Sequence, residues 1–280
     1  MSTVTTRLHQ DVIWDIDISS DHESVVAASQ DGTISVTDLN SGIQIFKTGK
    51  IEQCEFLTVS ISPIAPVFVS GDSGGKLRIW DLKTGELKKE VAASEKSIWH
   101  VDFSPSGKQL VCAGEDGSLT IWDTSSWKVI EALGENMECI STARFSSDGR
   151  FIVSAADDEI VRMFDAHTFE QVGKFVGHRH DVWRAVFSPD SRYIASSGYD
   201  GELIIWDVES RKLVHRIKAH DVEIAGLIFA DDGSRLMTGS DDGTIKIWDV
   251  ESAIELLELR TLDHSPVSYT HLTLPTIYSV

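Results

Sequence analysis

Cysteine is scarce in this chain of 280 residues, where only Cys54, Cys112 and Cys139 occur. Their number is odd and no C-x-x-C pair is present, which argues against both a disulfide framework and a zinc site. We therefore expect three reduced cysteines that behave as small, mostly buried apolar side chains.

Long apolar runs are missing as well. Residues 1–8 contain no apolar segment of the kind found in a signal peptide, and no run approaches the roughly 18 residues needed to span a bilayer. These absences predict a soluble, intracellular protein, cytoplasmic or, in a eukaryote, also nuclear.

Basic residues are outnumbered, with 25 Lys and Arg against 44 Asp and Glu, for a net charge of −19. Binding to a nucleic-acid backbone requires clustered Lys and Arg, so this composition argues against direct contact with nucleic acid. It favours a protein or peptide partner that is itself basic.

Motifs of known catalytic or metal chemistry are also lacking. No G-x-S-x-G or H-E-x-x-H sequence occurs, and the glycine-rich segment 71–75 has no P-loop lysine and precedes a strand. His178 and His180 could form a two-histidine metal site, but no third ligand lies nearby at a suitable spacing, so we expect His178 to be structural and His180 to lie on a loop. The sequence predicts neither a cofactor nor an enzyme.

What the chain does contain is a repeat. Six segments of similar pattern end in aspartates that are 43, 42, 42, 42 and 42 residues apart: Asp38, Asp81, Asp123, Asp165, Asp207 and Asp249. A fixed period of this length indicates a repeat architecture.

Each repeat carries the same internal order of elements. An apolar run ends in a turn such as SPDSR (188–192), a strand of small residues follows, and an Asp-Gly turn leads to an alternating strand that ends in Trp-Asp. A fourth alternating stretch, such as 212–220, leads to the next repeat. Alternation over four to eight residues between turn residues predicts β-strands, and four antiparallel strands in about 42 residues form one propeller blade.

These motifs resemble the WD40 β-propeller family over about residues 4–265. The resemblance implies an all-β fold with six recognisable blades of four antiparallel strands. It also implies a buried network in each blade, which joins a histidine, a hydroxyl, the turn aspartate and the tryptophan of the third strand. Carried over by position, the network residues are His9, Asp31, Asp116, Trp122, Asp158, His178, Asp200, Trp206, His220, Asp242 and Trp248.

Several repeats depart from this pattern. The first has Thr37 in place of the tryptophan, the second has Gly74 in place of the turn aspartate, and the fourth has Glu159 and Phe164 in place of glycine and tryptophan. The second and third repeats also lack the matching histidine. We expect these blades to rely more on apolar packing.

Counting strands gives one too many at the N-terminus. The stretch 3–8 corresponds to an outer strand without a blade of its own, and such a strand closes the last blade in WD40 rings. We therefore expect a seven-bladed ring whose seventh blade is incomplete, within a domain of residues 1–265.

The last residues, 266–280, follow none of the repeat features. The segment 267–276 (VSYTHLTLPT) is similar to the translation of a sequencing adapter. We interpret residues 266–280 as a non-native tail; a divergent natural tail is the alternative.

Two aligned positions predict a binding surface on the face that carries the loops between blades. The first, early in each inner strand, holds Trp14, Leu57, Trp99, Ile140, Trp183 and Ile224. The second, before the turn aspartate, holds Gln30, Ser73, Glu115, Asp157, Tyr199 and Asp241. Tryptophan is a frequent binding anchor, although packing between blades could equally explain these residues. The predicted partner-binding residues are Trp14, Trp99, Trp183, Arg184, Glu115, Asp157, Tyr199 and Asp241.

The leading hypothesis is a non-catalytic scaffold that binds protein or peptide partners as a subunit of a multiprotein complex. The segments 62–66 and 9–16 resemble the Ski8-like WD40 scaffold proteins. A sensor or regulatory propeller within a larger protein is the alternative, and a propeller enzyme is a third, since a fold alone does not determine a function.

Overall fold

The computed structural model describes residues 8–133 and 138–260. Contacts divide the chain into two compact units, Met1–Asn136 (unit 1) and Met137–Val280 (unit 2). The start of the expected seventh blade and the tail 266–280 lie outside the described residues, as does the predicted N-terminal strand apart from Leu8.

Only strands and turns occur in the described part of the chain, which therefore has no helix that could cross a membrane. The strands of unit 1 are β1 (Ile13–Ile18), β2 (Ser24–Ser29), β3 (Ile34–Asp38), β4 (Gln44–Lys47), β5 (Phe56–Ile61), β6 (Val67–Asp72), β7 (Lys76–Asp81), β8 (Leu87–Ala92), β9 (Ile98–Phe103), β10 (Gln109–Gly114), β11 (Leu119–Asp123) and β12 (Lys128–Ala132). The strands of unit 2 are β13 (Ile140–Phe145), β14 (Phe151–Ala156), β15 (Ile160–Asp165), β16 (Gln171–Val176), β17 (Val182–Phe187), β18 (Tyr193–Gly198), β19 (Glu202–Asp207), β20 (Leu213–Lys218), β21 (Ile224–Phe229), β22 (Arg235–Ser240), β23 (Thr244–Asp249) and β24 (Glu255–Arg260).

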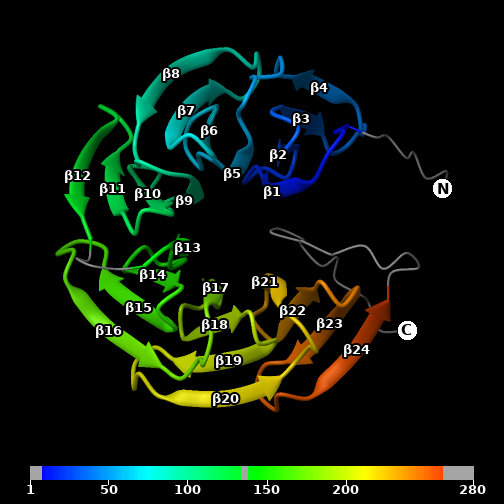
Figure 1. Cartoon of the computed structure of the whole chain (residues 1–280), viewed down its shortest axis with the longest axis vertical. Helices are drawn as coiled ribbons and strands as arrows, with labels where there is room; N and C mark the ends of the chain where they lie inside the picture. Colours follow the sequence, from blue (N-terminus) through cyan, green and yellow to red (C-terminus); the bar gives the residue numbers. More distant parts are fainter. Residues whose placement is uncertain (1–7, 134–137, 261–280) are drawn as a thin grey trace. The chain divides into compact units, whose positions relative to one another are not determined.

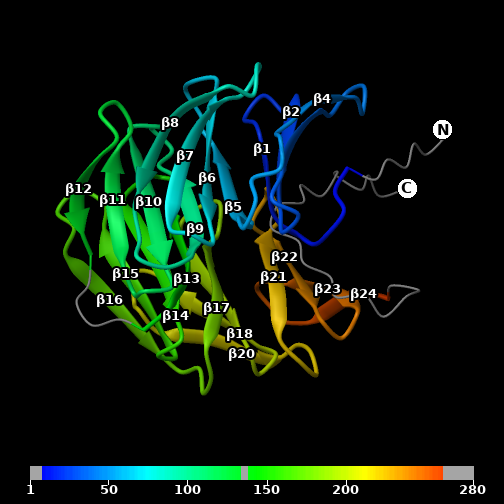
Figure 2. The same cartoon turned by 45° about the horizontal axis from the view of Figure 1, so that its top comes forward.

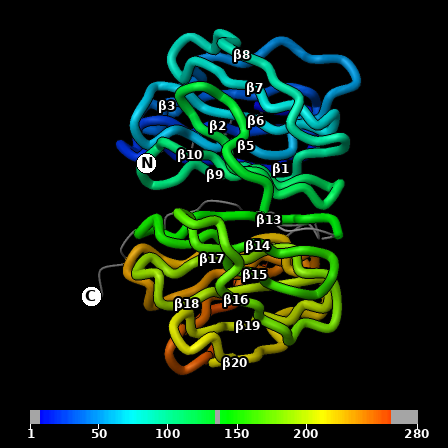
Figure 3. The backbone as a smooth tube through the Cα atoms, turned by 90° about the vertical axis from the view of Figure 1, so that its left-hand side faces the viewer, coloured from blue at the N-terminus to red at the C-terminus, as the bar shows by residue number. Residues whose placement is uncertain are grey.

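The strands form six four-stranded antiparallel sheets, each built from four consecutive strands. Their up-and-down course can be followed in Figure 1, Figure 2 and Figure 3. The prediction of an all-β chain with six propeller blades of four antiparallel strands is confirmed. Blades 1–3 belong to unit 1 and blades 4–6 to unit 2.

Within each unit the first strands of successive blades contact one another, β1 with β5 and β5 with β9, or β13 with β17 and β17 with β21. The hydrophobic core lies between adjacent blades. One cluster joins blades 4 and 5 through residues such as Val153, Met163, Phe187 and Trp206. Because both faces of an inner sheet are covered in this way, the second strands are built of small and apolar residues instead of alternating ones.

The close approach of neighbouring blades explains one glycine of these second strands. A Cβ atom on Gly71 in β6 would lie 2.5 Å from Cγ2 of Ile98 in the next blade. A larger residue at this position would therefore require the side chains of Ile98 and Thr58 to shift.

Side chains of the first strands also bind the backbone of the next blade. Asp15 accepts hydrogen bonds from the Val59 amide at 3.0 Å and from the Thr58 hydroxyl at 2.8 Å. In unit 2, Thr142 donates to the carbonyl of Trp183 at 2.6 Å. These contacts satisfy backbone groups at the free edge of each first strand, which has no neighbouring strand to pair with.

Candidate functional site

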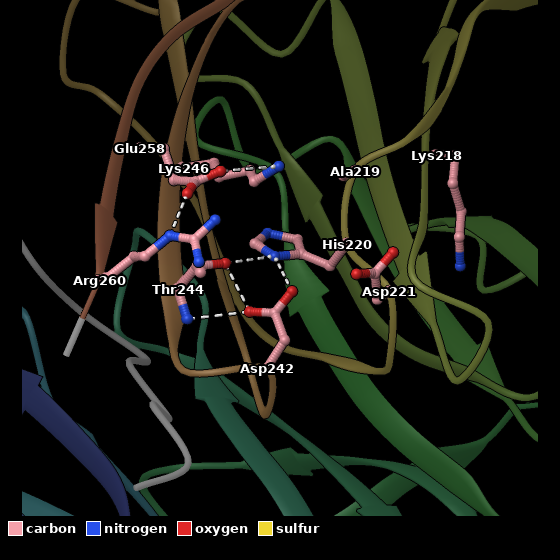
Figure 4. A pocket seen from close by; sticks show the side chains of 9 residues that line it. All are labelled: Lys218, Ala219, His220, Asp221, Asp242, Thr244, Lys246, Glu258 and Arg260. Carbon is pink, nitrogen blue, oxygen red and sulfur yellow. Dashed lines mark hydrogen bonds and ion pairs between the residues drawn. The ribbon is translucent and has the colours of Figure 1, made fainter. Parts of the chain in front are cut away.

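Blades 1 and 6 each contain a buried histidine that joins the loop before the first strand to the turn between the second and third strands. In blade 6, Nδ1 of His220 lies 3.0 Å from Asp242 Oδ2 and 2.9 Å from Thr244 Oγ1, while Nε2 lies 2.6 Å from Thr238 Oγ1 (Figure 4). Trp248 donates its indole N–H to the same Thr238 hydroxyl at 3.0 Å. We call this set of contacts the blade brace.

The brace of blade 1 uses a different hydroxyl, because Ala27 and Thr37 stand at the positions of Thr238 and Trp248. His9 instead contacts Ser35 of β3 at 2.7 Å, and its other nitrogen lies 3.0 Å from Thr33 and 3.4 Å from Asp31.

In blade 5 the structure brings only part of the expected network together. His178 Nε2 lies 2.7 Å from Ser196 Oγ, to which Trp206 donates at 2.8 Å. Asp200 instead accepts the Glu202 amide at 3.0 Å, and among the described residues Nδ1 of His178 has no hydrogen-bond partner.

Blades 2 and 4 lack the histidine in the described residues, and we expected them to rely on apolar packing. That expectation is wrong for the brace, because an arginine on the third strand replaces the histidine. In blade 2, Arg78 pairs with Asp72 and donates to Glu90 at 2.8 Å. In blade 4, Arg162 donates to Asp158 Oδ1 at 3.0 Å.

Sequence reasoning missed both arginines, although a signal was present. Arg78 and Arg162 stand at the same phase of the repeat, and both face the second strand, at Ser70 and Ser154. Asp72 also takes the role expected of position 74, because it accepts the amides of Gly74 and Lys76 at 2.8 and 3.0 Å.

In blade 3 the network residues Asp116 and Trp122 do not meet. Trp122 donates to Thr120 of its own strand at 2.9 Å, and Asp116 accepts the amides of Glu95 and Ser118, each at 2.9 Å. Cys112 occupies the position where blades 5 and 6 have a hydroxyl on the second strand, so the indole finds its acceptor elsewhere.

The brace histidines are held in the neutral form. Burial lowers the pKa of His178 to about 4, and it also lowers the pKa of His220 although Asp242 acts in the opposite direction. Since an indole N–H can only donate, Ser196 accepts from Trp206 and has its own proton available for Nε2 of His178. The braces are therefore structural contacts that depend on an uncharged imidazole.

The predicted aromatic position lies at a β-bulge. In every blade the pairing of the first and second strands shifts by one residue at this point, as between Val182 and Arg184 in blade 5. A bulge residue has no partner across the ladder, which allows its side chain to point differently from its neighbours.

The bulge corrects the alignment made from the sequence. In blades 4 and 6 the shifts fall between Ile140 and Thr142 and between Ile224 and Gly226. The residues equivalent to Trp183 are therefore Ser141 and Ala225, and the earlier choice of Ile140 and Ile224 was wrong by one position. Those isoleucines are fully buried core residues.

The second predicted position is fixed by a backbone hydrogen bond. The amide of the residue before each turn aspartate position donates to the carbonyl of the residue directly before the first strand. In blade 5 Tyr199 donates to Asp181 at 3.0 Å, and in blade 6 Asp241 donates to Glu223 at 3.4 Å. Each blade thus presents three side chains at the same end: one before the first strand, one at the bulge and one before the turn.

In unit 1 these positions hold Trp14, Trp99 and Glu115 among others. The indole nitrogens of Trp14 and Trp99 are buried and have no partner among the described residues, while Glu115 lies 3.9 Å from the ammonium of Lys96. The side-chain amide of Gln30 donates to the carboxylate of Glu55 in the next blade at 3.5 Å.

In unit 2 the same positions form an aromatic and acidic surface. The rings of Trp183 and Tyr199 lie 6.2 Å apart at an angle of 53°, and Tyr199 is 56% exposed. Asp157 of blade 4 is close to Asp181, which precedes the first strand of blade 5, and Glu223 and Asp241 both belong to blade 6. We call these six residues the unit 2 patch.

The carboxylates of the unit 2 patch repel one another. Burial and the charge of Asp181 raise the pKa of Asp157, and burial together with Asp241 raises the pKa of Glu223 to about 7. Within the described ranges, none of the four carboxylates has a lysine, arginine or histidine nitrogen within 4.0 Å. At neutral pH Glu223 is therefore about half protonated, and the remaining charge of the patch is negative and has no basic side chain of the described residues within that distance.

Arg184, also predicted to bind a partner, lies beside the patch. It follows the bulge residue, and its Nε donates to the carbonyl of Ala225 in blade 6 at 2.9 Å. This contact gives Arg184 a role in joining blades 5 and 6.

The polar pocket at one end of blade 6 is occupied by its own ion pairs (Figure 4). Glu258 lies 2.6 Å from Arg260 and 3.4 Å from Lys246, next to the brace of His220. In residues 8–133 and 138–260, no three His, Cys, Asp or Glu side chains are placed to hold a metal ion.

Comparison with known proteins agrees with this geometry. The family model of the WD domain, G-beta repeat, matches residues 2–38, 85–123, 128–165, 169–207 and 211–249, more than half of the chain. The chain is also 34% identical over 97 residues to Autophagy-related protein 16 of Arabidopsis thaliana, a match that covers 34% of this chain and 19% of that protein. The chain belongs to the WD40 repeat family.

Proposed function

We propose that the chain is a non-catalytic protein-interaction module that binds a partner segment through the unit 2 patch. The observation that supports this most is the pair formed by Trp183 and Tyr199. Trp183 stands at a bulge, where the sheet does not require a large apolar residue, and most of the Tyr199 side chain is open to solvent. Rigid aromatic side chains of this kind are preferred anchors in protein interfaces.

The charge of the patch indicates the kind of partner. Four carboxylates without counterions favour a segment that carries lysine or arginine, and a chain of net charge −19 would attract such a segment from a distance. A multiprotein complex, cytoplasmic or nuclear, is part of the same proposal.

A second candidate is an interaction or sensor module within a longer protein. It is favoured by the relative found above, in which the matching region accounts for 19% of the length. That relative is named for autophagy; because the match covers only 97 residues, we infer from it a shared repeat architecture and leave the process open.

The experiment is a capture of partners from cell extract with the whole chain, comparing wild type with Tyr199→Ser. Gln30→Ser serves as the matched control, because Gln30 stands at the same position in unit 1. We expect Tyr199→Ser to lose the captured partners and Gln30→Ser to retain them, with circular dichroism showing both folded. Retention of every partner by Tyr199→Ser would refute the proposal.

A photo-reactive amino acid at position 199 gives an independent result. It should crosslink the same partner that Tyr199→Ser loses, whereas crosslinking only from position 30 would place the binding surface in unit 1.

A further inference from the structure

The residues around Trp183 and Tyr199 follow a regular order that limits which partner segment fits. Each blade of unit 2 contributes two residues whose backbones are joined by a hydrogen bond, so that their side chains lie at the same end of the blade. The distances from amide nitrogen to carbonyl oxygen are 3.0, 3.0 and 3.4 Å. The pairs are Cys139 with Asp157, Asp181 with Tyr199, and Glu223 with Asp241.

The order of these pairs follows from the contacts between blades. β17 contacts β13 on one side and β21 on the other, so blade 5 lies between blades 4 and 6. The residue before the turn in one blade reaches the residue before the first strand of the next blade, as Gln30 does to Glu55 in unit 1. The same relation brings Asp157 next to Asp181, whose charge raises the pKa of Asp157.

The result is an alternation of charge and aromatic surface. Along the chain, the carboxylates Asp157 of blade 4 and Asp181 of blade 5 precede the aromatic pair of blade 5, and Glu223 and Asp241 of blade 6 follow it. Each pair of like charges is unfavourable by itself, and a single cation placed between its members would relieve the repulsion. The exposed ring of Tyr199 beside Trp183 offers an apolar contact between the two acidic ends.

Resting on the proposed function, we propose that the unit 2 patch binds an extended protein segment in which one apolar or aromatic side chain lies between two lysine or arginine side chains. The central side chain contacts Trp183 and Tyr199. One cation lies between Asp157 and Asp181, and the other between Glu223 and Asp241. A segment with only one cation leaves one acidic pair uncompensated.

Fluorescein-labelled peptides in a glycine-serine background test this pattern by anisotropy against the whole chain. The first peptide has the core Arg-Gly-Leu-Gly-Arg, the second replaces one arginine by serine, and the third keeps both arginines on the same side of the leucine. We expect the first to bind about 1.5-fold to fivefold more tightly than the others, since an exposed ion pair contributes only a small part of the binding free energy. Equal affinity of the three peptides would overturn the pattern.

Variants assign the two ends. Asp157→Asn with Asp181→Asn, or Glu223→Gln with Asp241→Asn, should each weaken the first peptide to the affinity of the second. Glu115→Gln, at the same position as Asp157 but in unit 1, should leave its affinity unchanged. Reversing one end with Asp157→Lys and Asp181→Lys should restore binding to a peptide in which one arginine is replaced by glutamate; failure of this rescue would also count against the pattern.

The salt dependence of wild-type binding requires no substitution and so does not depend on how a variant folds. The first peptide should lose affinity more steeply with NaCl than the second. If Tyr199→Ser abolishes binding while the four carboxylate substitutions have no effect, the flanking pattern fails and the proposed function stands. If Tyr199→Ser affects neither peptide nor partner, the proposed function itself fails.

Discussion

Two serines at the same position of neighbouring blades should respond differently to substitution by alanine. Ser196 in blade 5 and Ser154 in blade 4 both lie on the second strand and are both buried. The Ser196 hydroxyl lies 2.7 Å from His178 Nε2 and 2.8 Å from Trp206 Nε1. The Ser154 hydroxyl has no hydrogen-bond partner among the described residues, because Phe164 provides no N–H there.

Ser196→Ala removes the common partner of two buried polar groups. A buried donor or acceptor that loses its partner costs about 1–3 kcal/mol, so we expect the free energy of unfolding to fall by about 2–4 kcal/mol after some relaxation. Ser154→Ala removes a hydroxyl that is already unsatisfied, so we expect a change within about 0.5 kcal/mol or a slight gain in stability. At roughly 2–4 °C per kcal/mol, the melting temperatures of the two variants should differ by about 5–15 °C.

Urea unfolding followed by circular dichroism measures both variants under the same conditions. Hydrogen exchange of the β18 and β19 amides shows whether the loss in Ser196→Ala is local to blade 5. If the two variants have stabilities within about 0.5 kcal/mol of each other, the blade brace does not stabilise the fold through these hydrogen bonds, and the reasoning is refuted.

Three further predictions concern ionisation and backbone strain. His178 has a pKa of about 4 when folded and about 6.5 when unfolded, so its contribution to the free energy of unfolding is complete above pH 6.5 and is smaller by about 2 kcal/mol at pH 5. Urea unfolding at pH 7.5 and 5 should therefore give a change in the free energy of unfolding that is about 2 kcal/mol less favourable in wild type than in His178→Gln. Burial, with the nearby charges of Asp15 and Asp102, raises the pKa of Asp17 to about 7. The free energy of unfolding should therefore fall as the pH rises from about 4 to 7, because the unfolded state loses this proton first. Asp17→Asn should raise the urea midpoint at pH 8 and leave it unchanged at pH 4. Glu159 has a φ of +67° where other blades have glycine, so Glu159→Gly should increase the free energy of unfolding by about 0.5–1 kcal/mol, and a decrease would show that its side chain compensates for the strain.

The repeat period was sufficient to predict the blades, because each blade has the same physical requirements. The alternating third strands, the turn residues and the Trp-Asp ends recur every 42 or 43 residues, and all six four-stranded sheets follow from them. Among the described residues, only blade 6 matches the sequence pattern in full: His220 contacts Asp242 directly and shares the Thr238 hydroxyl with Trp248.

The other braces could not be predicted by aligning each residue with its family position. A buried polar group needs a partner, but that partner can come from any strand within reach. In blade 1, Ser35 on the third strand supplies the hydroxyl that the second strand supplies in blade 6. In blades 2 and 4, Arg78 and Arg162 on the third strands take the place of the histidine. The two arginines could have been found by searching the repeats that lack the histidine for another polar residue at one shared repeat position.

The aromatic position was misaligned for a related reason. Matching apolar residues favoured Ile140 and Ile224, whereas the strict period from Trp99 leads to Ser141 and, from Trp183, to Ala225. The isoleucines belong to the core and recur because the core requires them. The bulge residue faces no such requirement, so its identity changes from blade to blade and periodic apolar patterning cannot locate it.

This difference separates the residues that maintain the fold from those available for binding. Six copies of one unit within a single chain share their packing, so a position that the packing determines should look alike in all six. The end of the third strand comes close to that rule, with a buried tryptophan in four blades and the buried Phe164 in blade 4, and Thr37 in blade 1 is the exception. The bulge position instead ranges from Trp183 to Ala225, although the backbone shift around it is the same in every blade. Because the fold accepts both, folding does not explain the tryptophan in blade 5, and contact with a partner remains the explanation that the Tyr199→Ser experiment can test.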